Sequence, residues 1–172
     1  MSTEYSTLLS TQTKDFLFGI KGLNNGKLEN LVQEYHDLFK VPLSKYVAAY
    51  ESVYRNGHLS GQSAVNVKKI YNTLGFRIPR EHYELPDHLG IELAFIAVLC
   101  KEEHKAWKSK NTRLAGSVRK TEERFLNDHI IPWLPELYRK ICEKTKSSFY
   151  PAMAKITLDF VLADANTLIQ TI

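Results

Sequence analysis

The sequence predicts an all-α protein, built as a single-domain helical bundle of roughly seven to nine helices over residues 1–172. Apolar residues recur at spacings of three and four along most of the chain, as they do on the buried face of a helix. No segment alternates apolar and polar residues as a half-buried strand does, and no internal repeat is visible. A chain of 172 residues is long enough to bury one sizeable core.

Composition places the chain among ordinary globular proteins. Its hydrophobic content is 44% and its charged content 24%, close to the average for folded domains. The N-terminus lacks a basic segment followed by an apolar one, and no apolar run reaches the roughly 20 residues that cross a bilayer. We therefore expect a cytoplasmic protein without integral membrane association.

The excess positive charge lies in one stretch. Of the net charge of +4, all comes from the segment between Lys101 and Arg124, which holds eight basic and four acidic residues. Surfaces that bind single-stranded nucleic acid interleave basic residues with aromatic ones, and this segment has one aromatic residue, Trp107. We interpret the segment as a solvated, mobile connection between helices and expect no nucleic-acid partner.

Helical spacings define the first half of the chain. The pattern predicts a helix over residues 6–22 and a second one over residues 27–39. Residues 43–54 suit either a helix or an aromatic-rich strand. A further helix covers residues 64–74 and ends at Gly75, which fits the position just after a helix.

A buried helix is expected at the centre of the fold. The run from Leu93 to Cys100 is entirely apolar, which is typical of a helix inside a core. Pro86 disfavours helical geometry at the residue before it, so the helix begins just after the proline. Asp87 then stands where an N-cap accepts hydrogen bonds from free backbone N–H groups.

Prolines divide the second half of the chain. A helix that starts near Val118 must end near Ile131, because Pro132 and Pro135 follow. Proline is tolerated in the first turn of a helix, so a new helix carries residues 134–141. The last helix begins at about Ser148.

The residue types indicate no catalytic or cofactor site. Residues 22–28 resemble a phosphate-binding loop but are one residue short between the glycines, lack the Ser or Thr after the lysine, and lie between helices. His88 and Glu92 share a helical face, yet a metal would need a further ligand. We interpret Cys100 and Cys142 as reduced core thiols, because no CxxC spacing is present.

The polar cluster before the central helix allows two interpretations. Carboxylates are stabilised at the start of a helix by the positive end of its dipole, so the cluster can serve only to cap the helix. Alternatively, it is a recognition surface. The residues concerned are Glu84, Asp87, His88 and Glu92.

Four stretches in a fixed order add a resemblance to a known family. They are residues 50–54, 71–75, 84–95 and 125–135, of which the Pro-Asp-His-x-Gly-x-Glu-Leu motif and the downstream His-x-x-Pro-Trp are the most specific. Together they resemble the TorD/DmsD/NarJ family of chaperones for molybdenum-containing oxidoreductases. The resemblance implies a TorD-like helical fold, no enzymatic activity and no cofactor.

The resemblance also implies a partner. Such chaperones bind the twin-arginine leader or N-terminus of a molybdopterin oxidoreductase catalytic subunit and hold it during cofactor insertion, before export or assembly. A divergent member that assists metal insertion into another metalloenzyme, or binds a guanine nucleotide, is the alternative. We expect a monomer, with a domain-swapped dimer hinged in residues 108–120 as the other possibility.

The resemblance places client binding at the polar cluster and beside it. The residues expected to bind the leader are Glu84, Pro86, Asp87, His88, Glu92, Glu51, Tyr54 and Trp133. Carboxylates would meet the arginines of the leader, and a groove walled by aromatic residues such as Tyr50 and Phe95 would hold its apolar part. His88 would either tune binding near neutral pH or act as a structural hydrogen-bond donor.

Overall fold

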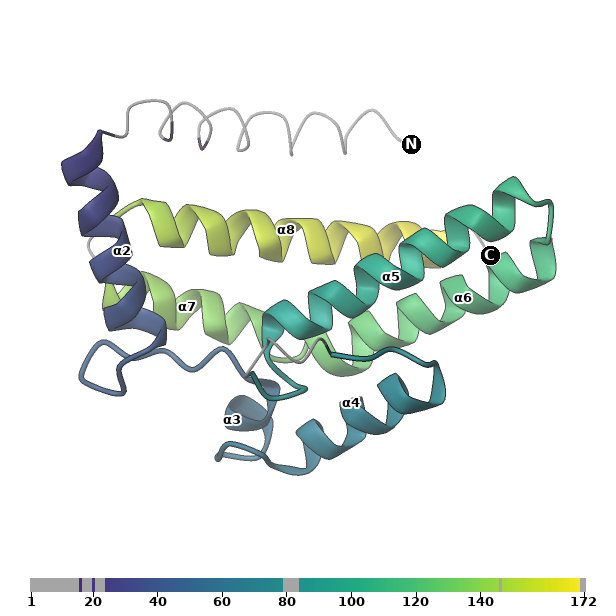
Figure 1. Ribbon diagram of the computed structural model, residues 1–172, viewed down its shortest axis with the longest axis horizontal. Helices are drawn as coiled ribbons and strands as arrows, with labels where there is room; N and C mark the ends of the chain where they lie inside the picture. The colour runs from purple at the N-terminus through teal and green to yellow at the C-terminus, as the bar shows by residue number, and fades with distance from the viewer. Residues whose placement is uncertain (1–15, 17–19, 21–23, 79–83, 146, 171–172) are drawn as a thin grey trace. The chain divides into compact units, whose positions relative to one another are not determined.

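The computed structural model describes residues 16, 20, 24–78, 84–145 and 147–170 (Figure 1). Over these residues the chain is all-α, with seven α-helices and one π-helical segment, which confirms the predicted fold class. The helix predicted for residues 6–22 lies largely outside the described residues. The chain folds as two compact units, residues 1–48 with 134–163 and residues 49–133 with 164–172. A single domain over the whole length stays a prediction.

The first unit contains α2 (Asn25–Phe39), α7 (Leu134–Lys144) and most of α8 (Phe149–Gln170). Asn24 caps α2, because its side chain accepts a hydrogen bond from the Lys27 N–H. Apolar residues bury one side of α7 at helical spacing, and the Tyr150 hydroxyl ties α8 to α2 by donating to the Leu31 carbonyl. The bounds of these three helices lie close to the predicted ones.

The second unit begins with α3 (Glu51–Arg55) and α4 (Gln62–Thr73). The ambiguous segment over residues 43–54 divides at Tyr50, which forms an isolated antiparallel bridge with His88 before the short helix starts. Of the residues whose spacing predicted this helix, α4 buries Ala64, Val67 and Tyr71, whereas Leu74 follows the end of the helix and is exposed. Gly75 follows it with a φ of 73°, a conformation that favours glycine.

Helices α5 (Leu89–Lys108) and α6 (Thr112–Phe125) form an antiparallel pair, and α6 continues into the π-helical segment η1 (Leu126–Ile130) (Figure 1). The mobile connection predicted for the basic segment between Lys101 and Arg124 is therefore wrong. The connection is a short turn that ends at Asn111, whose side chain caps α6. Lysine, arginine and glutamate are good helix formers, so a charged stretch can continue a helix into solvent.

Two further predictions about α5 are wrong. His88, and not Asp87, is its N-cap. Cys100 lies on the exposed face of α5, and Cys142 on α7 is exposed as well, so neither free thiol belongs to a core. Helix α5 buries one face only, because α6 covers the side that carries Phe95 and Leu99. Among the described residues, no helix has the length and apolar character needed to cross a membrane.

Candidate functional site

The motifs over residues 50–54 and 84–95 meet at a backbone bridge in the second unit. The Leu89 N–H donates to the Ala49 carbonyl, and the Glu51 N–H donates to the Asp87 carbonyl, each at a distance of 2.9 Å. The bridge places the rings of Tyr50 and His88 edge to face, with centroids 5.0 Å apart. The start of α3 is thereby held against the turn that precedes α5.

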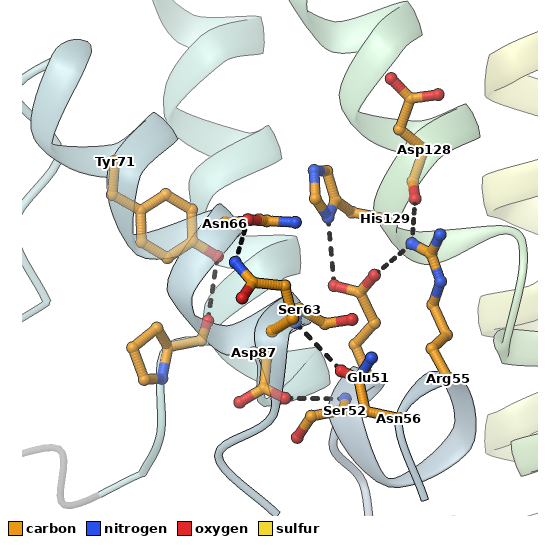
Figure 2. Close-up of polar contacts among 12 residues, drawn as sticks. Glu51, Ser52, Arg55, Asn56, Ser63, Asn66, Tyr71, Asp87, Asp128 and His129 are labelled. Carbon is orange, nitrogen blue, oxygen red and sulfur yellow. Dashed lines mark hydrogen bonds and ion pairs between the residues drawn. The ribbon is translucent and has the colours of Figure 1, made fainter.

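Asp87 caps the short helix α3 across this bridge (Figure 2). Its carboxylate is fully buried and accepts from the Ser52 N–H at 2.8 Å. Tyr50, the residue directly before α3, does not cap it with its side chain. The turn is also held from the opposite side, where the Tyr71 hydroxyl donates to the Pro86 carbonyl at 3.1 Å. Asp87 therefore stabilises α3 instead of the helix that follows it.

His88 caps α5 through its imidazole ring. Its Nδ1 accepts from the Gly90 N–H at 3.1 Å, so the neutral ring carries its proton on Nε2. The ring is half-buried. At this contact His88 acts as a hydrogen-bond acceptor, which differs from the structural donor considered from the sequence. Glu84, also half-buried, accepts a hydrogen bond from the Tyr50 hydroxyl.

Glu51 connects α3 to the π-helical segment η1. Its carboxylate is fully buried, with one oxygen 2.5 Å from Nη1 of Arg55 and the other 3.1 Å from Nδ1 of His129 (Figure 2). The same Arg55 nitrogen donates to the backbone carbonyl of Asp128 at 2.6 Å. Two groups of η1, the Asp128 carbonyl and the His129 ring, therefore contact one arginine and one glutamate of α3.

Glu92 is a second buried carboxyl group beside Glu51. It is fully buried, and neither of its oxygens has a hydrogen-bond partner within the described part of the chain when both glutamates are ionised. Burial and, next, the negative charge of Glu51 raise the pKa of Glu92 well above its ordinary value. As a neutral acid, Glu92 donates its proton to Glu51, and this hydrogen bond raises the pKa further.

The predicted site residues fall into two classes of exposure. Solvent reaches the half-buried side chains, which are those of Glu84, Pro86, His88 and Tyr54. The fully buried side chains are those of Glu51, Asp87, Glu92 and Trp133. Asp87 and Glu92 were expected to present carboxylates to a ligand at the surface, and in this structure they do not.

Two residues of the expected aromatic wall, Trp133 and Phe95, are also buried. Trp133 is 1% exposed and stacks on Tyr54, with ring centroids 5.2 Å apart. Phe95 is 1% exposed and packs against Tyr71 and Phe125 in the core of the second unit. Trp133 and Phe95 therefore pack in the core next to the site and do not line an open groove.

Sequence reasoning missed two members of the cluster. Arg55, which follows the segment over residues 43–54, was given no role, and His129 was placed in the downstream motif without a partner. Since a buried glutamate needs a cation or a hydrogen-bond donor, Glu51 in the first motif was a signal that such partners exist. In the described ranges, no group of three His, Cys, Asp or Glu side chains is placed to hold a metal ion.

Comparison with known proteins gives the family. Residues 4–139 match the family model described as nitrate reductase delta subunit. The chain is 27% identical over 143 residues to a chaperone protein TorD of Vibrio cholerae, with 83% of this chain and 64% of that protein covered.

Two further relatives are assembly chaperones of other reductases. A selenate reductase assembly chaperone protein of Thauera selenatis is 32% identical, with 70% of this chain and 62% of that protein covered. A chlorate reductase assembly chaperone protein of Ideonella dechloratans is 27% identical, with 74% of this chain and 67% of that protein covered. The chain thus spans 62% to 67% of the length of the three relatives. Because the family model matches most of the chain and includes every residue of the site, the chain belongs to the nitrate reductase delta subunit family, which includes the TorD-type chaperones.

Proposed function

We propose that this protein is a cytoplasmic maturation chaperone without enzymatic activity. It binds the twin-arginine leader or N-terminal segment of a molybdopterin oxidoreductase catalytic subunit and holds that subunit during cofactor insertion. The names of the relatives support this role, since they are chaperones called TorD or assembly chaperones of selenate and chlorate reductase. The observation that carries the proposal is the half-exposed group of Tyr50, Glu84 and His88, built on buried carboxyl groups.

The chemistry of this group fits a leader that combines arginines with an apolar stretch. Glu84 supplies a carboxylate that solvent reaches, and a carboxylate pairs directionally with a guanidinium. The half-buried rings of Tyr50 and Tyr54 supply apolar area, which suits a surface that binds a peptide. The backbone bridge beside Asp87 holds Tyr50 against His88, and buried Trp133 stacks on Tyr54.

A pull-down with matched variants tests the proposal. The tagged protein is recovered from its own source grown anaerobically, and captured proteins are identified by mass spectrometry. Glu84→Gln and His88→Ala are compared with His104→Ala, which changes an exposed histidine on α5 outside the site. Asp87→Ala is a poor probe, because it removes the cap of α3 and lowers stability.

We expect the wild type and His104→Ala to capture a molybdopterin oxidoreductase catalytic subunit, and Glu84→Gln and His88→Ala to capture much less of it. Far-UV circular dichroism checks that all variants are folded. Failure of the wild type to capture any such subunit would overturn the chaperone role. Equal capture by all the variants would keep the role and overturn the site.

A further inference from the structure

We propose that Glu51, Glu92 and the backbone carbonyl of Asp128 form a guanidinium-binding site, which Arg55 of the same chain fills and which an arginine of the client takes by displacing Arg55. The inference rests on the proposed function, because the client is what supplies the second arginine. It adds the position at which that arginine binds and the residue that competes with it.

Pro132 makes the Asp128 carbonyl available. In an α-helix this carbonyl would accept from the backbone N–H four residues later, and proline has none. At the end of η1, the Ile131 N–H donates to the Leu126 carbonyl, and the Trp133 N–H donates to the Ile130 carbonyl. The Asp128 carbonyl accepts instead from Nη1 of Arg55 at 2.6 Å (Figure 2).

Arg55 uses this site incompletely. One nitrogen, Nη1, serves both the Glu51 carboxylate and the Asp128 carbonyl. A guanidinium has five N–H donors and can pair with a carboxylate through two parallel hydrogen bonds. Because Arg55 is four residues from Glu51 on one short helix, its reach is constrained. An arginine from another chain does not have this constraint.

Glu92 shows that the site has more acceptor capacity than Arg55 satisfies. It is 0% exposed, adjoins Glu51, and lacks a donor for both oxygens within the described part of the chain. As a neutral acid Glu92 donates to Glu51, and its other oxygen still lacks a donor, so a ligand that brings an N–H donor gains from supplying it. Among the described residues, Arg55 makes no hydrogen bond to Glu92, so this acceptor lies outside the contacts of Arg55.

Exposure shows how a ligand would reach the site. The side chain of Arg55 is 41% exposed, whereas that of Glu51 is 0% exposed. Arg55 therefore extends from solvent to the buried carboxylate, and rotation of its side chain outward uncovers Glu51. Loss of Arg55 alone would leave the buried Glu51 carboxylate without a cation, which is costly, so Arg55 leaves only when the incoming guanidinium takes its place.

A small-molecule probe tests the site without any client. Thermal unfolding of the full chain is measured with millimolar ethylguanidinium or ethylammonium, for the wild type, Arg55→Ala and Arg124→Ala. Arg124 is an exposed arginine on α6, so the control makes the same change of charge. We expect ethylguanidinium to raise the melting temperature of Arg55→Ala only, and ethylammonium to have little effect.

Adding Glu51→Gln to Arg55→Ala should abolish the ethylguanidinium effect. An equal shift in wild type, Arg55→Ala and Arg124→Ala, or no shift in Arg55→Ala, would overturn the site. If Arg55→Ala does not fold, Arg55→Gln takes its place, since it keeps a donor for the Asp128 carbonyl and leaves the Glu51 carboxylate accessible.

A peptide probe then tests displacement. A synthetic peptide with two adjacent arginines before an apolar segment, and its twin-lysine version, are titrated calorimetrically. Arg55→Ala should bind the twin-arginine peptide about fivefold more tightly than the wild type, the factor expected when a partly exposed ion pair no longer competes. The affinity for the twin-lysine peptide should change much less.

The ethylguanidinium and peptide probes together separate the guanidinium site from the proposed leader-binding function. Unchanged or weaker binding by Arg55→Ala of a twin-arginine peptide that the wild type binds would overturn displacement. If the wild type bound neither peptide, the proposed leader-binding function would fail, and the ethylguanidinium result would still decide whether the guanidinium site exists.

Discussion

Glu92→Gln should stabilise the protein at pH 8 and change its stability little at pH 5. Glu92 is fully buried beside Glu51 and has no donor for its oxygens among the described residues. At low pH it is a neutral acid that donates to Glu51. The amide of glutamine also donates and is nearly the same shape, so the substitution keeps that hydrogen bond at every pH.

The sign of the effect follows from the direction of the pKa shift. Burial raises the pKa of Glu92 well above its ordinary value of 4.5. The folded state therefore binds a proton that the unfolded state releases, and this contribution is fully present below pH 4.5 and is lost as the pH rises toward the folded-state pKa. The loss for one proton is at most about 1.4 kcal/mol per pH unit.

The total size of the effect can be judged from the contacts. An ionised Glu92 would be a buried group without hydrogen bonds, which costs about 1–3 kcal/mol or more for a charge. We therefore expect the free energy of unfolding of Glu92→Gln to exceed that of the wild type by about 1–3 kcal/mol at pH 8.

Urea unfolding followed by far-UV circular dichroism at pH 5, 6, 7 and 8 measures this difference. Glu102→Gln, at an exposed position on the same helix, serves as the control and should show no comparable pH-dependent gain. Destabilisation of Glu92→Gln by the same amount at every pH would refute the reasoning, because it would mean that Glu92 is ionised and stabilising in the fold.

Substitutions at three other positions probe the buried groups. Asp87→Ala should lower the free energy of unfolding by about 1–2 kcal/mol in urea, and Asp87→Asn by less, because asparagine also caps a helix. Burial raises the pKa of Glu122 to about 8, so its stabilising effect is lost as the pH rises through 8, and Glu122→Gln should gain more stability at pH 9 than at pH 6 in the same assay. Trp133→Ala should cost about 3–5 kcal/mol in thermal or urea unfolding because it leaves a cavity beside Tyr54, and Trp133→Phe should cost less.

Most helices could be predicted because their signals are local. In α4, the spacing of Ala64, Val67 and Tyr71 marks the buried face, and Gly75 marks the end. Caps, spacing and prolines all act within one or two turns, so residues close together in sequence determine where a helix begins and ends. The charged end of α5 was missed because its surface residues carry no apolar pattern, although their helix propensity is high.

The roles of the site residues could not be predicted in the same way, because they depend on contacts between distant segments. Asp87 stands directly before α5, so its position favoured capping that helix. It instead accepts from the N–H of Ser52, 35 positions earlier in the chain, and so caps α3. Carboxylates are usually exposed, so Glu92 was expected at the surface. Only its packing against Glu51 reveals a buried pair.

Pro132 links a local signal to one of these distant contacts. Its helix-breaking property predicted correctly that the preceding helix ends, and the same missing N–H leaves the Asp128 carbonyl without its regular donor. Arg55, 73 residues earlier in the chain, supplies the donor and at the same time pairs with Glu51. A carbonyl that loses its helical donor to a proline accepts from another group or from water. At Asp128 that group is Arg55, and this is the contact on which the proposed guanidinium site depends.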